Sequence, residues 1–496
     1  MARVVVVGAG VGGLAVAIRL AVQGHEVRIV EQSPRAGGKL ETYDRGGFRF
    51  DTGPSLLTLP AVYRDLFLKS GQPLEDEVEL VEVDPAFRHR FADGTEVDLP
   101  NGSPGKVAAA LDAALGEPSG TEWLRLIDRA HAMWKATRGP VLESPVASAR
   151  DLARLARRLG DLRVVAPGRS LHALGARQLS DPRARQLLDR YATYTGSDPR
   201  SAPAVLATIP YVEQTFGAWH VTGGLGRLGE ALHRRALDRG VDVRLDCDVT
   251  GIELDGGRAS GVRLADGARM PADVVVSDVD ATALYGELLP AGVAVSARRR
   301  LQHSTPSFSG FTVLLALRGG SRPDRLSHHT VLFPRDYEAE FDTLFGRTGA
   351  PVDDPSIYVC APDDATMSPD GSTAVTLLVN APRHGEGRGC VDWTTTGLAE
   401  SYADRVLSTL ARRGVDLRDR VDWREVRTPA DLAGQTRSPG GAIYGTASHG
   451  VRGFLRAANR SPVPGLFLVG GSAHPGGGLP LVGMSAAIVA DLVGRA

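Results

Sequence analysis

A short run of glycines near the start of the chain constrains the fold more than any other feature. The β-branched residues 4–7 lead directly into Gly8-Ala9-Gly10-Val11-Gly12-Gly13. Residues 14–22 have the composition of a helix, and a second apolar run, residues 26–30, ends at Glu31. Parallel strands buried on both faces are continuous runs of apolar residues, so this order predicts a strand, a glycine turn, a helix and a strand.

The spacing of these glycines matches a dinucleotide-binding turn. In such a turn, Gly8 makes the tight bend, Gly10 lets the backbone approach a pyrophosphate, and Gly13 lets the helix pack on the strand. The helix that begins near Gly12 presents unpaired N–H groups to phosphate charge. Glu31, about 20 residues on, would accept hydrogen bonds from ribose hydroxyls. A βαβ unit without a ligand does not account for the glycines and Glu31 occurring together.

Composition excludes several classes of protein. A chain of 496 residues is long enough for two or more structural regions. Its 43% hydrophobic and 23% charged residues are typical of a globular protein, and a formal net charge of −1 gives no support to nucleic-acid binding. Three widely separated cysteines argue against a disulfide framework, so we expect a cytoplasmic protein.

The apolar start of the chain does not predict a targeting segment. Four glycines interrupt residues 1–20, and no convincing cleavage site follows. The sequence contains no uninterrupted apolar stretch of the length that spans a membrane. Peripheral attachment at the inner face of the membrane stays open.

A second glycine turn follows the acidic residue. It reads Arg35-Ala36-Gly37-Gly38-Lys39, and residues 48–55 then contain Asp51-Thr52-Gly53-Pro54-Ser55. Here the sequence resembles the phytoene desaturase-type flavoproteins, within the wider group that includes amine oxidases. Lys39 stands where those relatives usually have arginine, which keeps a cation but loses its bidentate geometry.

The resemblance implies an α/β fold, with a Rossmann-like FAD-binding domain of the glutathione-reductase and amine-oxidase type. An α+β substrate domain is inserted into it. The implied FAD-binding domain consists of residues 1–95, 213–285 and 436–496, and the substrate domain of residues 96–212 and 286–435. The resemblance also implies FAD contacts from the second turn and the segment after it: Arg35, Gly38, Lys39, Pro54 and Ser55.

The middle of the chain extends this resemblance. Its sequence resembles that of the hydroxycarotenoid 3,4-desaturases in the stretch Arg190-Tyr191-Ala192-Thr193-Tyr194-Thr195-Gly196. Residues 241–245, 249–254, 261–264 and 274–276 alternate or run like strands. In the relatives, a backbone group at the position of Val249 holds the adenine. On local evidence alone, a plain meander of strands describes this stretch nearly as well.

The C-terminal region contains a second glycine-rich loop. Residues 466–469 form an apolar run, residues 470–478 include five glycines, and residues 481–493 have the pattern of a helix. The resemblance implies that this helix begins at the flavin, where its dipole favours the negative charge of reduction. It also implies cofactor contacts from Gly471, Ser472, Leu481 and Val482. An ordinary strand-to-helix connection is the alternative, although such connections rarely contain so many glycines.

FAD is the only cofactor that the sequence predicts. Only one complete dinucleotide fingerprint is visible, so a second site for NADPH has no support. The electron acceptor, oxygen or a quinone, stays open. His328 and His329 could suggest a metal, but no third ligand follows at a useful spacing, and adjacent residues on a strand face opposite sides. We therefore expect no metal site.

Two further stretches concern the substrate region. Residues 105–185 are helical in pattern, and residues 308–317 and 328–333 read as strands of a separate sheet. Within the helical part, leucines and arginines alternate in a basic amphipathic pattern over residues 150–159. Such a helix either presents a solvated face or lies at a membrane surface.

The resemblance implies a lipophilic small-molecule substrate and removal of a hydride and a proton from it. A long apolar tunnel would hold the target C–H bond against the flavin. The sequence names no catalytic residue, although four candidates flank the segments expected near the flavin: Glu213, Trp219, His328 and His474. For each of these, a role in packing or hydrogen bonding is the competing interpretation.

Three hypotheses follow for the function. The first is a desaturase of phytoene or a hydroxylated carotenoid. The second is an FAD-dependent dehydrogenase or reductive cyclase of a polyene secondary metabolite. The third is a lipid carrier resembling the Rab GDP-dissociation inhibitors, against which the intact glycine fingerprint argues.

Overall fold

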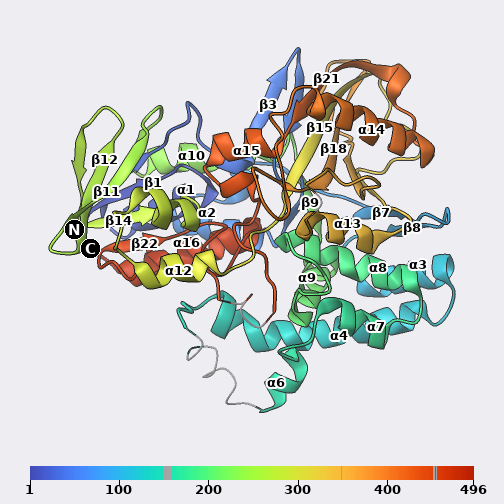
Figure 1. Ribbon diagram of the computed structural model, residues 1–496, viewed down its shortest axis with the longest axis horizontal. Helices are drawn as coiled ribbons and strands as arrows, with labels where there is room; N and C mark the ends of the chain where they lie inside the picture. Colours follow the sequence, from blue (N-terminus) through green and yellow to red (C-terminus); the bar gives the residue numbers. More distant parts are fainter. Residues whose placement is uncertain (149–150, 152–158, 348, 451–452, 454) are drawn as a thin grey trace.

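The computed structural model describes residues 1–148, 151, 159–347, 349–450, 453 and 455–496. A five-stranded parallel sheet has the strand order β10-β2-β1-β14-β22 and lies near both termini (Figure 1). Its strands come from three distant parts of the chain: β1 (Arg3–Val7), β2 (Glu26–Val30), β10 (Asp242–Arg244), β14 (Val274–Ser277) and β22 (Leu466–Leu468). The order runs outward from β1 in both directions. Ligands bind such sheets at the carboxyl ends of the strands, where the order reverses.

Both faces of this sheet are buried, which explains the continuous apolar run of β1. Val4 and Val6 pack with helices, whereas Val5 and Val7 pack with a second small sheet. The helices are α1 (Val11–Val22), α2 (Ala61–Lys69), α10 (Gly226–Asp238) and α16 (Leu479–Val493). The small sheet contains β11 (Val249–Asp255), β12 (Arg258–Leu264) and β13 (Arg269–Pro271). The strands and helices predicted for these segments are confirmed.

A seven-stranded mixed sheet forms the second part of the molecule, with the order β21-β15-β18-β17-β16-β7-β8 (Figure 1). Its strands are β7 (Phe87–Arg90), β8 (Glu96–Leu99), β15 (Ser309–Arg318), β16 (His329–Leu332), β17 (Ile357–Cys360), β18 (Ser372–Ala381) and β21 (Val421–Arg427). One face packs against α14 (Leu398–Arg412) in a core of aliphatic and aromatic residues. The separate sheet predicted over residues 308–317 and 328–333 is confirmed.

A group of helices lies against the other side of the seven-stranded sheet, and residues from both form one hydrophobic core (Figure 1). These helices are α3 (Pro104–Leu115), α4 (Ser119–Thr137), α6 (Leu159–Val165), α7 (Leu171–Gln178), α8 (Pro182–Arg190), α9 (Thr208–Phe216) and α13 (Tyr337–Phe345). The helical pattern predicted for residues 105–185 is confirmed where the structure describes it.

The predicted basic amphipathic stretch falls largely outside the described residues. Positions 150, 152, 154, 155, 157 and 158 are not described, so the two interpretations of this stretch stay predictions. Among the helices that the structure does describe, none has the length and apolar character needed to cross a membrane.

Shorter elements connect these parts. The strands are β3 (Thr42–Arg45), β4 (Phe48–Asp51), β5 (Leu57–Thr58), β6 (Leu80–Glu82), β9 (Ala218–Val221), β19 (Arg383–His384) and β20 (Cys390–Val391). The helices are α11 (Ala281–Ala283), α12 (Val295–Gln302) and α15 (Pro429–Thr436).

Two of the predicted domain boundaries need correction. The boundary at residue 95 cuts the hairpin of β7 and β8, although Phe87 pairs with Leu99 and both strands belong to the seven-stranded sheet. The boundary at residue 285 is also too early. Leu288, Leu289 and Ala297 pack in the core beneath the parallel sheet, because the chain covers that sheet before it leaves for β15. The rest of the domain division stays a prediction.

Candidate active site

The first glycine turn has the geometry that the sequence predicts. Gly8 lies in the left-handed region with φ of 100° and ends β1. A Cβ atom at Gly13 would lie 2.0 Å from the carbonyl oxygen of Gly8, so only glycine allows α1 to pack this closely. Gly8, Gly10 and Gly12 line a cavity of about 380 Å³ at the carboxyl end of the parallel sheet, which we call the cofactor cavity. Gly13 is not among its lining residues and acts through packing.

Glu31 lies at the end of β2 and lines the same cavity. Its Oε2 accepts a hydrogen bond of 2.7 Å from the N–H of Ala9, and its Oε1 accepts one of 2.8 Å from the N–H of Ser33. The carboxylate is therefore held in a single position beside the glycine turn. Its place fits the predicted contact with a ribose, which remains untested.

The second glycine turn folds onto the first. The N–H of Gly37 donates to the carbonyl of Ala9 at 2.8 Å, and Gly38 lines the cofactor cavity. Arg35 lies apart from this cavity: its side chain is 62% exposed, and its guanidinium forms an ion pair of 3.5 Å with Glu41. The predicted cofactor contact of Arg35 therefore has no support from its position.

Lys39 has a position different from the one expected for a phosphate-binding cation. Its Nζ donates to the carbonyl of Ile443 at 2.7 Å, and burial lowers the pKa of this ammonium group. The nearby carboxylates of Asp280 and Asp278 act in the opposite direction. Lys39 thus joins the N-terminal segment to the C-terminal segment, and it still lines the cofactor cavity.

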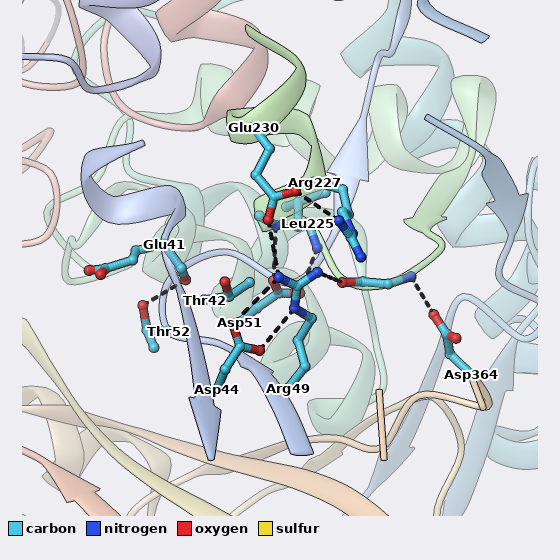
Figure 2. A network of polar contacts seen from close by, with 12 residues as sticks. Glu41, Thr42, Asp44, Arg49, Asp51, Thr52, Leu225, Arg227, Glu230 and Asp364 are labelled. Atoms are coloured by element: carbon cyan, nitrogen blue, oxygen red, sulfur yellow. Dashed lines mark hydrogen bonds and ion pairs between the residues drawn. The ribbon is translucent and has the colours of Figure 1, made fainter. Parts of the chain in front are cut away.

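A buried carboxylate fixes the segment that leads to Pro54 and Ser55. Asp51 accepts hydrogen bonds from the N–H groups of Leu225 and Gly226 at 2.9 and 3.1 Å, at the N-terminus of α10 (Figure 2). Burial raises the pKa of Asp51 to about 6, although these hydrogen bonds oppose the shift. Pro54 and Ser55 follow directly and line both the cofactor cavity and a second cavity.

The arginine of this strand reaches outward to the same helix. The guanidinium of Arg49 pairs with Asp44 at 3.0 Å and with Glu230 at 3.1 Å, and Glu230 also pairs with Arg227 (Figure 2). The hairpin of β3 and β4 is therefore held against α10 by charge on its outer side and by Asp51 on its inner side. These contacts position residues 52–55. Arg49 itself does not line the cofactor cavity.

The far wall of the cofactor cavity comes from the second half of the chain. Val249, Gly471, Ser472 and Val482 line it, a position that fits their predicted cofactor contacts. The carbonyl of Val249 accepts a hydrogen bond of 2.9 Å from Arg437, and the hydroxyl of Ser472 accepts one of 2.9 Å from the N–H of Ala281. Helix α16 begins after Gly478, at the end of this wall.

Asp278 is a lining residue that the sequence analysis did not single out. It follows β14 as Glu31 follows β2, and burial raises the pKa of its carboxyl to about 7. A Cβ atom at Gly10 or Gly12 would lie 2.4 or 2.5 Å from this carboxylate. The sequence could have identified Asp278, because an acid that directly follows an apolar parallel strand lies at the edge of the sheet where ligands bind.

A second cavity of about 390 Å³ adjoins the first, and we call it the substrate cavity. Most of its walls are apolar, with side chains such as Trp134, Leu142 and Met484. Leu481, predicted to contact the cofactor, lines this cavity and not the cofactor cavity. The two cavities share residues at the start of α16 and on β17: Gly53, Pro54, Ser55, Tyr358, Leu378, Ile443, Tyr444, Gly477, Gly478 and Leu479.

Two of the four catalytic candidates line the substrate cavity. Glu213 is buried and accepts hydrogen bonds from the hydroxyls of Tyr191 and Tyr194 at 2.6 and 3.2 Å. Burial raises the pKa of Glu213 to about 7. His474 is buried too, and its Nε2 lies 2.7 Å from the carbonyl of Val141. Of these two residues, Glu213 is the one that offers a carboxyl group with a raised pKa to the cavity.

The other two candidates lie outside both cavities. The indole N–H of Trp219 donates to the carbonyl of Phe216 at 3.0 Å. His328 is buried beside His220, with ring centroids 4.8 Å apart. Neither side chain lines the substrate cavity, so the interpretation of packing is the better one for Trp219 and His328.

The histidine pair is arranged differently from the expected pair of side chains on opposite faces of a strand. His328 precedes β16, so its ring does not alternate with that of His329, and their centroids lie 4.4 Å apart. Cys360 pairs with His329 across β16 and β17. One ligand atom from each of the three residues lies within 4.8 Å of the others. Strand pairing, which the spacing in sequence does not show, brings the cysteine there.

Comparison with known proteins identifies the family. A model described as flavin containing amine oxidoreductase matches residues 11–493. The chain belongs to this family. Its cofactor is FAD, which the glycine turns, Glu31 and the start of α16 fit, because they line one cavity at the carboxyl end of the parallel sheet and several of its glycines leave no room for a Cβ atom.

Within this flavin family, the chain is similar to carotenoid-modifying enzymes. It is 33% identical to the 4,4'-diapolycopene oxygenase of Methylomonas sp, over 99% of this chain and 98% of that protein. It is 34% identical to the hydroxyneurosporene desaturase of Cereibacter sphaeroides, over 99% and 98%. The zeta-carotene-forming phytoene desaturase of Myxococcus xanthus is 32% identical, over 99% and 93%. The chain is thus an oxidoreductase of the carotenoid desaturase and oxygenase group that acts on CH–CH bonds.

Solved structures confirm the fold class. Putrescine oxidase bound to putrescine has a TM-score of 0.64 at 17% identity and covers 99% of this chain and 98% of its own. Cyclohexylamine oxidase from Brevibacterium oxydans has a TM-score of 0.63 at 18% identity and covers 99% of each chain. The α/β architecture with a Rossmann-like FAD-binding domain and a substrate domain is therefore confirmed.

Proposed function

We propose that this flavoprotein is a desaturase that removes a hydride and a proton from an extended isoprenoid or polyene, such as phytoene or a hydroxylated carotenoid. The observation that carries the proposal is the shared wall of the two cavities. A mostly apolar cavity of about 390 Å³ meets the cofactor cavity where α16 begins. An apolar chain bound there would place one of its C–H bonds beside the cofactor while water is excluded.

Bound FAD supplies the two-electron acceptor for the hydride. The chain itself supplies position, polarity and a place for the proton. The N-terminus of α16, which the two cavities share, favours negative charge that develops next to it. The carboxylate of Glu213 is the group in the substrate cavity with a pKa near neutrality, and we assign to it the proton that leaves the neighbouring carbon.

Two tyrosines hold this carboxylate in place. The hydroxyls of Tyr191 and Tyr194 donate to different oxygens of Glu213, and both tyrosine rings belong to the turn after α8. The ionised form accepts both bonds and is stabilised by them, whereas burial favours the protonated form. The group can therefore exist in either state near neutral pH, as proton transfer requires.

The experiment that tests the proposal is spectroscopic. The purified holoprotein is mixed with phytoene in liposomes without oxygen, and flavin absorbance is recorded. Bleaching of the flavin, with formation of a longer conjugated product, is the expected result. A flavin spectrum that does not change with phytoene or with a hydroxylated carotenoid would overturn the proposal. Such a result would favour the dehydrogenase or reductive cyclase of a secondary metabolite.

The lipid-carrier hypothesis loses its support. The family is one of flavin-containing oxidoreductases, and the chain retains the glycine turns and Glu31 that fit the cofactor. A carrier without flavin does not need a cavity in which a carboxylate, two glycine turns and a helix N-terminus converge.

A further inference from the structure

One side of the substrate cavity differs from the rest of its apolar wall. Arg190, the last residue of α8, and Tyr337, the first residue of α13, both line the cavity there. The two helices pack in the same hydrophobic core. A cation in a wall meant only for a hydrocarbon chain is unexpected, since buried charges in proteins are ordinarily paired.

The guanidinium of Arg190 is surrounded by aromatic faces. It lies 5.7 Å from the ring centroid of Phe87, 5.4 Å from that of Tyr194 and 5.9 Å from that of Tyr358. Such rings attract a cation and hold it in position, but they do not neutralise its charge. No residue that the structure describes forms a hydrogen bond or an ion pair with this guanidinium.

The carboxylates of the neighbourhood are all engaged elsewhere. Asp189 pairs with His172 at 2.7 Å, and Asp198 pairs with Arg200 at 2.9 Å. Glu213, an acid of the same cavity wall, attracts the charge of Arg190, but its two oxygens accept hydrogen bonds from tyrosines and not from this guanidinium. The N–H groups of Arg190 therefore have no hydrogen-bond acceptor in the described part of the chain.

A second polar group lies unused beside this cation. The hydroxyl of Tyr337 is buried, with the residue only 8% exposed, and has no hydrogen-bond partner among the described residues. Arg190 and Tyr337 line the same cavity, and each acts electrostatically on the other. A buried hydroxyl and a guanidinium that both lack a hydrogen-bond partner among the described residues, in the wall of one cavity, form a site for an anion.

We propose that Arg190 and Tyr337 form a subsite for a carboxylate-type anionic end group of the substrate. The guanidinium would bind the two carboxylate oxygens, the Tyr337 hydroxyl would donate to one of them, and the polyene would lie along the apolar wall. This inference rests on the proposed function and narrows its substrate class, from any polyene to polyenes with an acidic end. Because Tyr358 also borders the cofactor cavity, the acidic end would bind near the cofactor.

Three probes of equal chain length test the subsite: a linear polyene monocarboxylic acid, its methyl ester and the methyl-ended hydrocarbon. Each is presented in the same detergent micelles to the holoprotein at neutral pH. Binding is measured by quenching of tryptophan fluorescence, because Trp134 lines the cavity. The quantity compared is the ratio of the apparent Kd for the ester to that for the acid, so that partition into micelles cancels between variants.

We expect the acid to bind the wild-type protein about tenfold more tightly than its ester, and Arg190→Gln to reduce this ratio to about one. Tyr337→Phe keeps the ring and should reduce the ratio about threefold. Arg64→Gln is the matched control, since Arg64 also lies over an aromatic ring, at 5.8 Å from the ring centroid of Trp219, but outside the cavity. Its ratio should stay at the wild-type value.

Equal binding of acid and ester to the wild-type protein would overturn the subsite, and so would a ratio that Arg190→Gln and Tyr337→Phe both leave unchanged. The flavin absorbance of each variant shows that it is folded and loaded. If Arg190→Gln does not fold, the Tyr337→Phe ratio decides. The proposed desaturation is judged separately by anaerobic bleaching with phytoene, so equal binding combined with bleaching would remove the subsite alone.

Discussion

The cofactor cavity and the substrate cavity are built in different ways. Glycine turns contribute many of the residues that line the cofactor cavity, and the carboxylate of Glu31 is held there by the N–H groups of Ala9 and Ser33. The substrate cavity is lined by side chains from α4, α8, α9, β17 and α13. Backbone sites leave a signature in local sequence, whereas side-chain cavities depend on packing between distant elements.

The most damaging change to the first region is expected at Gly13. Replacement by valine places a Cβ atom 2.0 Å from the Gly8 carbonyl oxygen, which forces α1 away from β1. We expect loss of bound flavin and destabilisation by more than about 4 kcal/mol, or no folded protein. Flavin content and thermal unfolding measure it. Gly105→Ala is the control, because a Cβ atom there meets nothing within 4 Å.

A substitution in the second region should leave the cofactor in place. Glu213→Gln keeps the shape but removes the proton acceptor, so we expect kcat to fall about 100-fold or more while flavin content is unchanged. Single-turnover bleaching of the flavin measures this step directly. The exposed Glu386→Gln is the matched control. Full activity of Glu213→Gln would remove Glu213 from the reaction.

The pH dependence sharpens the same contrast. The pKa of Glu213 is about 7, and the carboxylate is the active form. The bleaching rate should therefore rise with pH through about 7 and level off above it, and it should fall about tenfold for each pH unit below. Glu213→Gln should lack this rise. A wild-type bleaching rate that does not change over about one pH unit on either side of this pKa would contradict the assignment of Glu213 as the proton acceptor.

Asp51 offers a smaller effect, on stability. Its folded pKa of about 6 lies above the ordinary value of 3.8, so the folded protein binds the proton more strongly than the unfolded chain. The contribution of this group to the free energy of unfolding is greatest at low pH and falls as pH rises from about 4 to about 6, by up to about 3 kcal/mol. Asp51→Asn should flatten this part of the pH profile, measured by denaturant unfolding. Equal profiles for the two proteins would contradict it.

The smallest effect is expected at the histidine and cysteine group. We expect the purified flavoprotein to contain no stoichiometric metal, and Cys360→Ser to change neither flavin content nor bleaching rate. Burial raises the pKa of the Cys360 thiol to about 12, which disfavours the thiolate that metals bind. Elemental analysis measures the metal. One zinc per chain that Cys360→Ser removes would show that strand pairing had created a site.

Most of the parallel sheet and part of the cofactor wall could be predicted from sequence. The strand of β2 was predicted with its observed bounds, and Glu31, Gly471 and Ser472 line the cavity as expected. Arg35 and Lys39 were harder, because a long side chain can leave the turn that carries it. Arg35 extends to Glu41, and Lys39 donates to the carbonyl of Ile443, about 400 residues away in sequence.

The sequence by itself determined the family, the cofactor and the strand–turn–helix frame, because each depends on residues close together in the chain. Only the tertiary structure decided which polar groups meet in the substrate cavity. It brings Glu213 to two tyrosine hydroxyls, Cys360 to a histidine pair, and Arg190 and Tyr337 to the wall of one cavity. These contacts join residues on separate elements, and side-chain packing, which has no local period, sets them.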